Sequence, residues 1–211
     1  YPWRAAATLL IVAGLGCGCY HVYQYVGSEQ FQERLVELNN LHVNDPKMEV
    51  DSCRIDVEQQ DDLLKFKADI IGTPVNEASA FTFTLNPGFK VASVTMNGKP
   101  LQFQREEHLL VIDFPAKVKS DERVAFTIEY EGVADERICY LDIPEETLNQ
   151  QEKFMDNFNI GKKYGYQSEE YTLLTPEIYW YPRPGVCYSS ESPDWQQSYF
   201  TNFSMKVKPN E

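Results

Sequence analysis

The stretch GFKVASVTMNGKPLQF, residues 88–103, decides the fold class of this chain of 211 residues. Apolar and polar side chains alternate along both halves, and this period of two places one face of a strand on a core and the other in water. Asn97 and Gly98 separate the halves, and this dipeptide is a strong signal for a two-residue hairpin turn. The stretch therefore predicts two antiparallel strands joined by a tight turn.

The same alternation continues on both sides of this hairpin. It recurs in RIDV (54–57), LKFKADI (64–70), FTFTL (81–85) and VAFTIEYEG (124–132). We therefore predict a mainly β domain over residues 48–208, built as a mostly antiparallel sheet or sandwich. Residues 144–167 lack the alternation and are polar, which predicts an insertion between strands.

An uncharged segment, AAATLLIVAGLGCGCYHVYQYV, occupies residues 5–26. As a helix it would be about 33 Å long, close to the thickness of the hydrocarbon core of a bilayer. Gly14 and Gly18 form a pair at a spacing that lets helices approach closely in lipid. We predict a transmembrane helix over residues 1–27; a secretory signal peptide and a lipoprotein signal ending at Cys17 are the alternatives. Each of these places the β-domain outside the cytoplasm.

A second helical pattern follows the apolar segment. Phe31, Leu35 and Leu38 recur at helical spacing, and Ser28 is a plausible cap before them. We predict a short amphipathic linker helix within residues 28–47, with its apolar side packed on the β-domain.

Composition and motifs exclude several classes of function. A formal net charge of −13 argues against binding to nucleic acid or to anionic lipid. The sequence has no His-Glu-x-x-His, no nucleophile elbow and no phosphate-binding glycine loop. His21, His42 and His108 are isolated in sequence, and we expect His42 and His108 to lie at the surface. We predict neither a metal site nor catalysis by this chain alone.

Five cysteines leave the redox compartment open. Cys17 and Cys19 lie in the apolar segment, whereas Cys53, Cys139 and Cys187 lie in the predicted β-domain. At most one disulfide can form among these three, and the spacing does not select the pair.

Aromatic residues and proline gather near the end of the chain, at Tyr179, Trp180, Tyr181 and Pro182. Such a cluster can form a flat platform for sugars, or it can bury large rings and fix a loop against a sheet. We favour the second interpretation and predict a structural aromatic corner.

The order of these segments resembles the N-terminal domain of zinc aminopeptidases of the gluzincin clan, the group of the alanyl aminopeptidases and the leukotriene hydrolase. The similar segments are RIDV, LKFKADI, GFKVASVTMNGKPLQF, HLLVIDFP (108–115), VAFTIEYEG and the closing stretch from Leu173 to Val207. The resemblance implies a saddle-shaped sheet that braces a separate catalytic domain, which holds the zinc. It also implies that Glu177, just before the aromatic corner, contributes to the pocket for the amino terminus of the substrate.

Three hypotheses follow for the function. The first is a non-catalytic β-domain of a membrane-anchored zinc aminopeptidase, bracing a catalytic domain that lies outside this chain and shaping its substrate cleft. The second is a non-enzymatic extracytoplasmic interaction domain of an ABC-type transporter permease or a lipoprotein. The third is a carbohydrate-binding β-sandwich. The expected partners are the membrane, the downstream domain or other transmembrane helices, and peptides.

Overall fold

The computed structural model describes residues 2–141, 165–186 and 201–209, and it divides into two compact units, Tyr1–Arg34 and Leu35–Glu211. A single helix, α1 (Pro2–His42), forms the first unit and begins the second. The helix continues through Ser28, so Ser28 is not a cap. Serine is only a moderately poor helix former, and the good helix formers Glu29 and Gln30 follow it.

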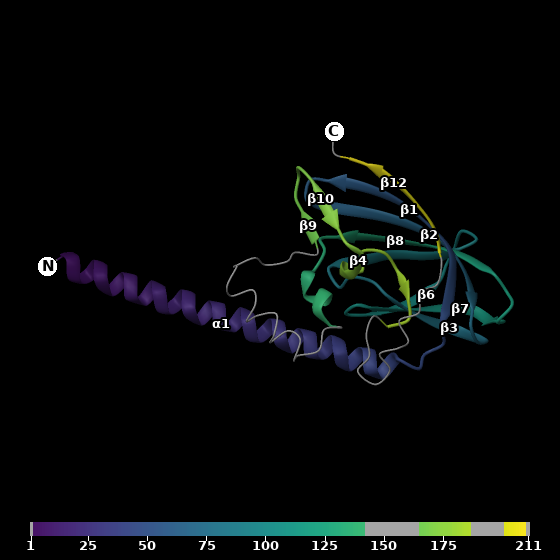
Figure 1. The fold of residues 1–211 in the computed structure, drawn as a ribbon, viewed down its shortest axis with the longest axis horizontal. Helices are drawn as coiled ribbons and strands as arrows, with labels where there is room; N and C mark the ends of the chain where they lie inside the picture. The colour runs from purple at the N-terminus through teal and green to yellow at the C-terminus, as the bar shows by residue number, and fades with distance from the viewer. Residues whose placement is uncertain (1, 142–164, 187–200, 210–211) are drawn as a thin grey trace, which may run out of the picture. The chain divides into compact units, whose positions relative to one another are not determined.

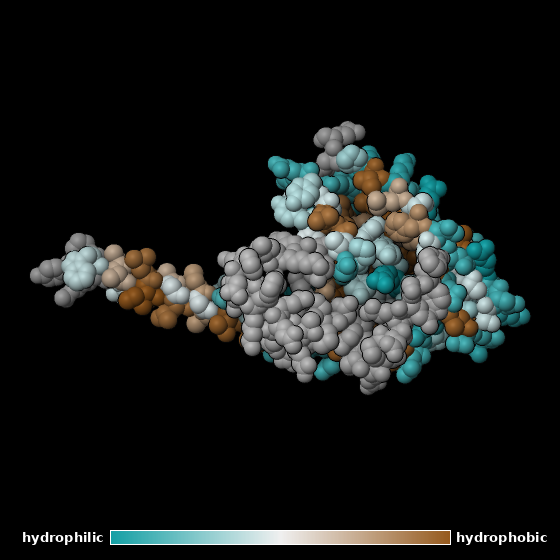
Figure 2. All heavy atoms as spheres, viewed as in Figure 1, coloured by the Kyte–Doolittle hydropathy of each residue, from teal (hydrophilic) through white to brown (hydrophobic). Residues whose placement is uncertain are grey.

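The N-terminal helix is long and apolar enough to cross a membrane, judged by the length and composition of Ala6–His42. Hydrophobic side chains cover much of its N-terminal part (Figure 2). A Cβ atom added at Gly14 or at Gly18 would meet no atom within 4 Å. The role of this glycine pair in packing against another helix stays a prediction.

The second unit is built from β-strands, which confirms the predicted mainly β fold class. One sheet has six strands in the order β12 (Asn202–Lys208), β1 (Met48–Gln60), β2 (Leu63–Pro74), β8 (Val124–Gly132), β4 (Phe89–Met96) and β5 (Lys99–Pro100). The other has four, in the order β11 (Arg183–Pro184), β3 (Ala78–Thr84), β7 (Leu109–Val118) and β6 (Gln102–Glu106). β9 (Gly165–Gln167) and β10 (Thr172–Leu174) form a small hairpin. All the pairs in the described part of the chain are antiparallel except β1 with β12, which are parallel (Figure 1).

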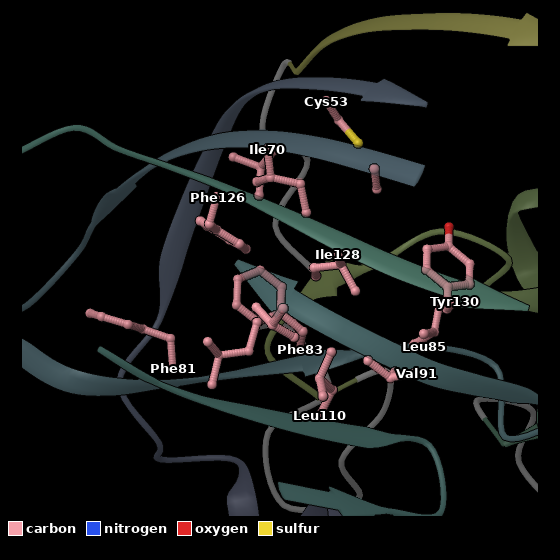
Figure 3. Close-up of a cluster of buried hydrophobic side chains, with 14 of the residues drawn as sticks. Cys53, Ile70, Phe81, Phe83, Leu85, Val91, Leu110, Phe126, Ile128 and Tyr130 are labelled. Atoms are coloured by element: carbon pink, nitrogen blue, oxygen red, sulfur yellow. The ribbon is translucent and has the colours of Figure 1, made fainter. Parts of the chain in front are cut away.

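The core lies between the two larger sheets, where the apolar positions of the alternating strands meet (Figure 3). Phe83 of β3 and Phe126 of β8 contact each other edge to face, with ring centroids 5.7 Å apart. Ile55, Ala68 and Ile128 are fully buried on the six-stranded sheet. The predicted polar insertion, residues 144–167, lies outside the described residues except for its end, which forms β9.

The end of α1 packs on this β-domain. Leu38 and Val43 form a buried cluster with Leu109 of β7 and Val186. This contact overturns the prediction that His108 lies at the surface: its side chain is fully buried, and its Nε2 lies 2.6 Å from Oδ1 of Asn39. The polar residues before His108 suggested an exposed hairpin tip, but the helix covers that tip.

His42, also predicted at the surface, is half-buried at the end of the same helix. Its Nδ1 lies 2.7 Å from Oδ2 of Asp45, and the Thr82 hydroxyl donates to the same oxygen at 2.6 Å. The segment after the helix is therefore fixed to β3.

Cys53 lies in the core as a free thiol, so it forms no disulfide with Cys139. Burial, with a smaller effect of the Asp69 carboxylate, raises the pKa of Cys53 to about 12. Cys187, the third cysteine of the predicted set, lies outside the described residues.

The predicted Asn97-Gly98 turn is confirmed. Both residues have positive φ, 53° and 73°, and they join β4 to β5. Left-handed backbone at both positions is typical of a type I′ turn, whose twist matches that of the flanking strands.

This turn allows a clean test of backbone strain, because a Cβ at Gly98 would meet no atom within 4 Å. We expect Gly98→Ala to lower the free energy of unfolding by about 1 kcal/mol, through the cost of left-handed backbone alone. Gly98→Asn is the matched control and should lose less, since asparagine tolerates this conformation. Urea unfolding measures both; equal stability of the alanine variant and the native chain would contradict the assignment.

Candidate functional site: the aromatic corner and the outer edge of the sheet

The aromatic corner, Tyr179 to Pro182, begins where a short 3-10 helix, η2 (Pro176–Ile178), ends. Pro176 suits the first position of that helix because it has no N–H to leave unpaired. Tyr179 then adopts left-handed backbone, with φ of 52°, and turns the chain back toward the sheet. Tyr179 and Pro182 are buried, while Trp180 and Tyr181 are half-buried.

The side chain of Asn86 holds this corner in place. It is fully buried, and its Nδ2 donates to the carbonyl oxygens of Ile178 at 2.7 Å and Asp135 at 3.0 Å. Its Oδ1 accepts from the backbone N–H groups of Gly88 at 2.9 Å and Asp135 at 2.8 Å. The backbone N–H of Asn86 also donates to the carbonyl of Tyr179 at 2.8 Å. One amide thus joins three segments of the chain. The sequence Asn-Pro-Gly at residues 86–88 by itself indicates only a turn.

Aromatic rings connect the corner to the six-stranded sheet. The hydroxyl of Tyr130 donates to the carbonyl of Trp180 at 3.0 Å, and the Tyr130 ring stacks on Phe66 at 4.7 Å. Trp180 and Tyr181 in turn contact the ring of Phe203 on β12, at centroid distances of 5.9 and 5.3 Å. The corner therefore packs between the middle of the sheet and its outermost strand.

Glu177, the residue predicted to serve a substrate pocket, lies on η2 with an exposed side chain. Among the residues that the structure describes, no group of three or more His, Cys, Asp and Glu side chains could hold a metal ion. The role of Glu177 stays a prediction. Four further aromatic residues of the closing stretch lie outside the described residues: Tyr188, Trp195, Tyr199 and Phe200.

The outermost strand exposes the side that would normally face a core. In the register of β1 with β12, Cys53, Ile55 and Val57 lie beside Phe203, Met205 and Val207. The three β1 residues are at most 9% exposed, but their β12 neighbours are 44%, 54% and 53% exposed. We call Phe203, Met205 and Val207 the edge stripe. Hydrophobic residues reach the surface in the region of β12 (Figure 2).

The alternation in the sequence predicted a strand at β12 but not this exposure. A period of two shows that one side of a strand is apolar, and the usual inference is that this side is buried. Whether a second layer covers it depends on where the strand joins the sheet. β12 joins at the margin, beside β1 (Figure 1).

The opposite face of the sheet carries charges that alternate in sign from strand to strand. Two rows of register neighbours cross it: Lys206, Asp56, Lys67 and Glu129 in the first, and Lys208, Glu58, Lys65, Glu131 and Lys90 in the second. We call these sets the charge rows. Cross-strand pairs of opposite charge stabilise a sheet, and like charges destabilise it.

A groove of about 780 Å³ lies over this face, and residues of the charge rows line it together with apolar residues such as Phe66, Ala92 and Pro209. The ammonium group of Lys208 lies 3.0 Å from the Glu58 carboxylate, and this hydrogen bond is the main reason why the pKa of Glu58 is lowered. On β1 and β2, each charge of the rows has a neighbour of opposite sign on either side. Such a compensated surface does not attract a charged ligand strongly.

No family model and no curated protein matches this chain. Among solved structures, it is similar to an M1 zinc metallopeptidase from Deinococcus radiodurans, with 13% identity and a TM-score of 0.40 over 42% of this chain and 21% of the peptidase. The same values hold for a mutant of that enzyme bound to a Tyr-Ser-Ala substrate. They hold also for a two-domain M1 zinc metallopeptidase mutant bound to L-arginine. The matched region thus spans about a fifth of each peptidase chain.

Proposed function

We propose that this chain is the membrane-anchored, non-catalytic β-domain of a zinc aminopeptidase-like protein and that it braces the catalytic domain. The observation that carries the proposal is the edge stripe. Phe203, Met205 and Val207 are about half exposed beside fully or nearly fully buried neighbours, and a contiguous apolar surface of this kind marks a contact with another protein surface. Because the aromatic corner contacts Phe203, the docking surface has a rigid support.

The order of the strand segments and of the closing aromatic stretch indicates what kind of domain docks at this edge. Their resemblance to the first domain of the gluzincin aminopeptidases supports a catalytic domain as the partner. In this proposal, the partner supplies the zinc and the His-Glu-x-x-His motif, and the β-domain supplies a supporting wall. Glu177, exposed beside the corner, would reach the end of the cleft that receives the substrate's amino terminus.

The N-terminal helix supports the membrane part of the proposal, because Ala6–His42 is long and apolar enough to span a bilayer. We place the β-domain on the extracytoplasmic side. The lone Arg4 before the apolar segment, and the acidic Glu29, Glu33 and Glu37 after it, favour a cytoplasmic N-terminal end.

The test compares this chain with the protein as its gene encodes it, in detergent micelles. We expect bound zinc and hydrolysis of alanyl-p-nitroanilide only in the gene-encoded protein. In that protein, Met205→Asp should lower kcat/KM by about tenfold or more, because a carboxylate in the edge stripe opposes burial against the partner. Ser120→Asp, at an exposed position in the turn after β7, is the matched control and should leave kcat/KM unchanged.

Two results would refute the proposal in different ways. Equal kcat/KM for the Met205→Asp and Ser120→Asp variants would show that the edge stripe does not support the catalytic domain. A gene-encoded protein without zinc or hydrolysis would remove the enzyme and favour the interaction domain of a transporter or lipoprotein.

A further inference from the structure

We propose that the partner docked at β12 contributes an extended strand with two acidic residues, one opposite Lys206 and one opposite Lys208. These acids would lengthen the charge rows by one strand, while the partner's alternate residues, which are apolar, pack beside the edge stripe. The inference rests on the proposed docking role of this edge and adds the chemistry of the segment that binds there.

The backbone of β12 is available for this mode of binding. β12 is the last strand in its sheet, and no strand within the described ranges 2–141, 165–186 and 201–209 pairs with its outer side. An unpaired strand edge is a template for an added strand, which gains affinity from main-chain hydrogen bonds and specificity from alternate side chains.

The charge rows indicate which strand fits. Both rows alternate in sign at every step through β12, β1, β2 and β8, and both end at the edge in a lysine. Lys208 contacts Glu58 on its inner side, at 3.0 Å. On the outer side, no described strand occupies the register position next to either lysine. A carboxylate there continues the pattern, whereas an ammonium group places like charges side by side.

The other face of β12 determines which residues stand between the acids of the partner strand. Phe203, Met205 and Val207 alternate with the lysine-bearing face, so a partner strand with acids at every second residue presents its remaining residues to the edge stripe. Apolar side chains at these positions pack beside the edge stripe and reduce its contact with water. The partner strand therefore has an alternating acidic and apolar sequence.

A second copy of β12 does not meet this requirement. Its lysine-bearing face contains only Asn202, Ser204, Lys206 and Lys208, so pairing two copies provides no acidic side chain. Edge lysines also protect sheets from indiscriminate pairing. Here, they select against strands that lack acids and favour one that has them.

A binding experiment with synthetic strands tests the inference on the full chain in detergent micelles at low ionic strength. The probes are two seven-residue peptides of alternating sequence, with Val and Thr at the shared positions. One carries Glu at the two positions opposite Lys206 and Lys208, and the other carries Lys there. Fluorescence titration of labelled peptides measures affinity, and hydrogen exchange over residues 202–208 locates the binding.

We expect the Glu peptide to bind about tenfold or more tightly than the Lys peptide, and to slow exchange in β12. In the double variant Lys206→Glu/Lys208→Glu the preference should reverse. Lys117→Glu/Lys119→Glu changes the net charge equally at exposed sites on and after β7, and there the preference for the Glu peptide should persist.

Several outcomes would overturn the inference. These are equal affinity of the two peptides, a preference that survives charge reversal at Lys206 and Lys208, and failure of both peptides to slow exchange in β12. If, in addition, Met205→Asp still lowers kcat/KM of the gene-encoded protein, the edge docks a partner but not through an acidic strand. If Met205→Asp has no effect there while the Glu peptide binds as expected, the strand chemistry stands and the bracing function fails.

Discussion

Replacing Asn86 with alanine should lower the free energy of unfolding by about 3 kcal/mol, more than any surface substitution in this domain. The truncation removes the partners of two backbone N–H groups, of Gly88 and Asp135, and of two carbonyls, of Asp135 and Ile178. Water cannot replace all of these bonds, because the Asn86 side chain is fully buried. Since the Ile178 carbonyl belongs to η2, the aromatic corner should loosen together with the fold.

Urea unfolding of the chain in detergent, followed by tryptophan fluorescence and circular dichroism, measures this effect. Asn76→Ala, at an exposed bend, is the matched control and should change stability by less than about 0.5 kcal/mol. Asn86→Asp should also be strongly destabilised, because an oxygen replaces Nδ2 and faces two carbonyl oxygens. If Asn86→Ala unfolds at the same urea concentration as Asn76→Ala, the hydrogen bonds of Asn86 do not hold the corner.

The stability of the β-domain should fall in mild acid because of His108. Burial, assisted by the positive charge of Arg105 and then by His42, lowers the pKa of His108 to about 3. The neutral ring donates from Nε2 to Oδ1 of Asn39. The unfolded chain takes up a proton on His108 near pH 6.5, whereas the folded chain does so only near pH 3. The contribution of neutral His108 to the free energy of unfolding is therefore complete above pH 6.5 and is lost as the pH falls toward 3.

The expected loss at pH 5 is about 2 kcal/mol from this residue. Denaturant unfolding at pH 7 and pH 5 measures it as the difference between the native chain and His108→Gln, which keeps a donor of similar reach but does not titrate. The variant should be less stable at pH 7 and lose less stability on going to pH 5. Parallel pH profiles for the two chains would show that His108 is protonated in the folded state.

The local pattern of the sequence was sufficient to predict the strands. The alternation in 64–70 and 124–132 corresponds to β2 and β8, and Asn97-Gly98 forms the expected turn. These features depend on neighbours within a few residues, so the sequence contains the whole signal. The apolar N-terminal segment was readable for the same reason.

Features set by distant contacts could not be predicted in this way. His108 follows two glutamates, a pattern typical of an exposed turn, but it is buried by Asn39, 69 residues earlier in the chain. The hydrogen bond from Asn86 to Ile178 crosses 92 residues. The aromatic corner was visible from its composition, whereas the residues that hold it, Asn86 and Tyr130, were not. The exposed edge stripe depends on the parallel pairing of β12 with β1, which the alternation cannot reveal.

Hydrogen exchange over residues 202–208 is the most direct test of the claim that the β12 edge docks a neighbouring domain. The measurement compares the 211-residue chain with the gene-encoded protein under identical conditions. We expect outward-facing amides of β12 to exchange about tenfold or more slowly in the gene-encoded protein, and Met205→Asp to remove the difference. Equal exchange in the two proteins would contradict the docking of a domain at this edge.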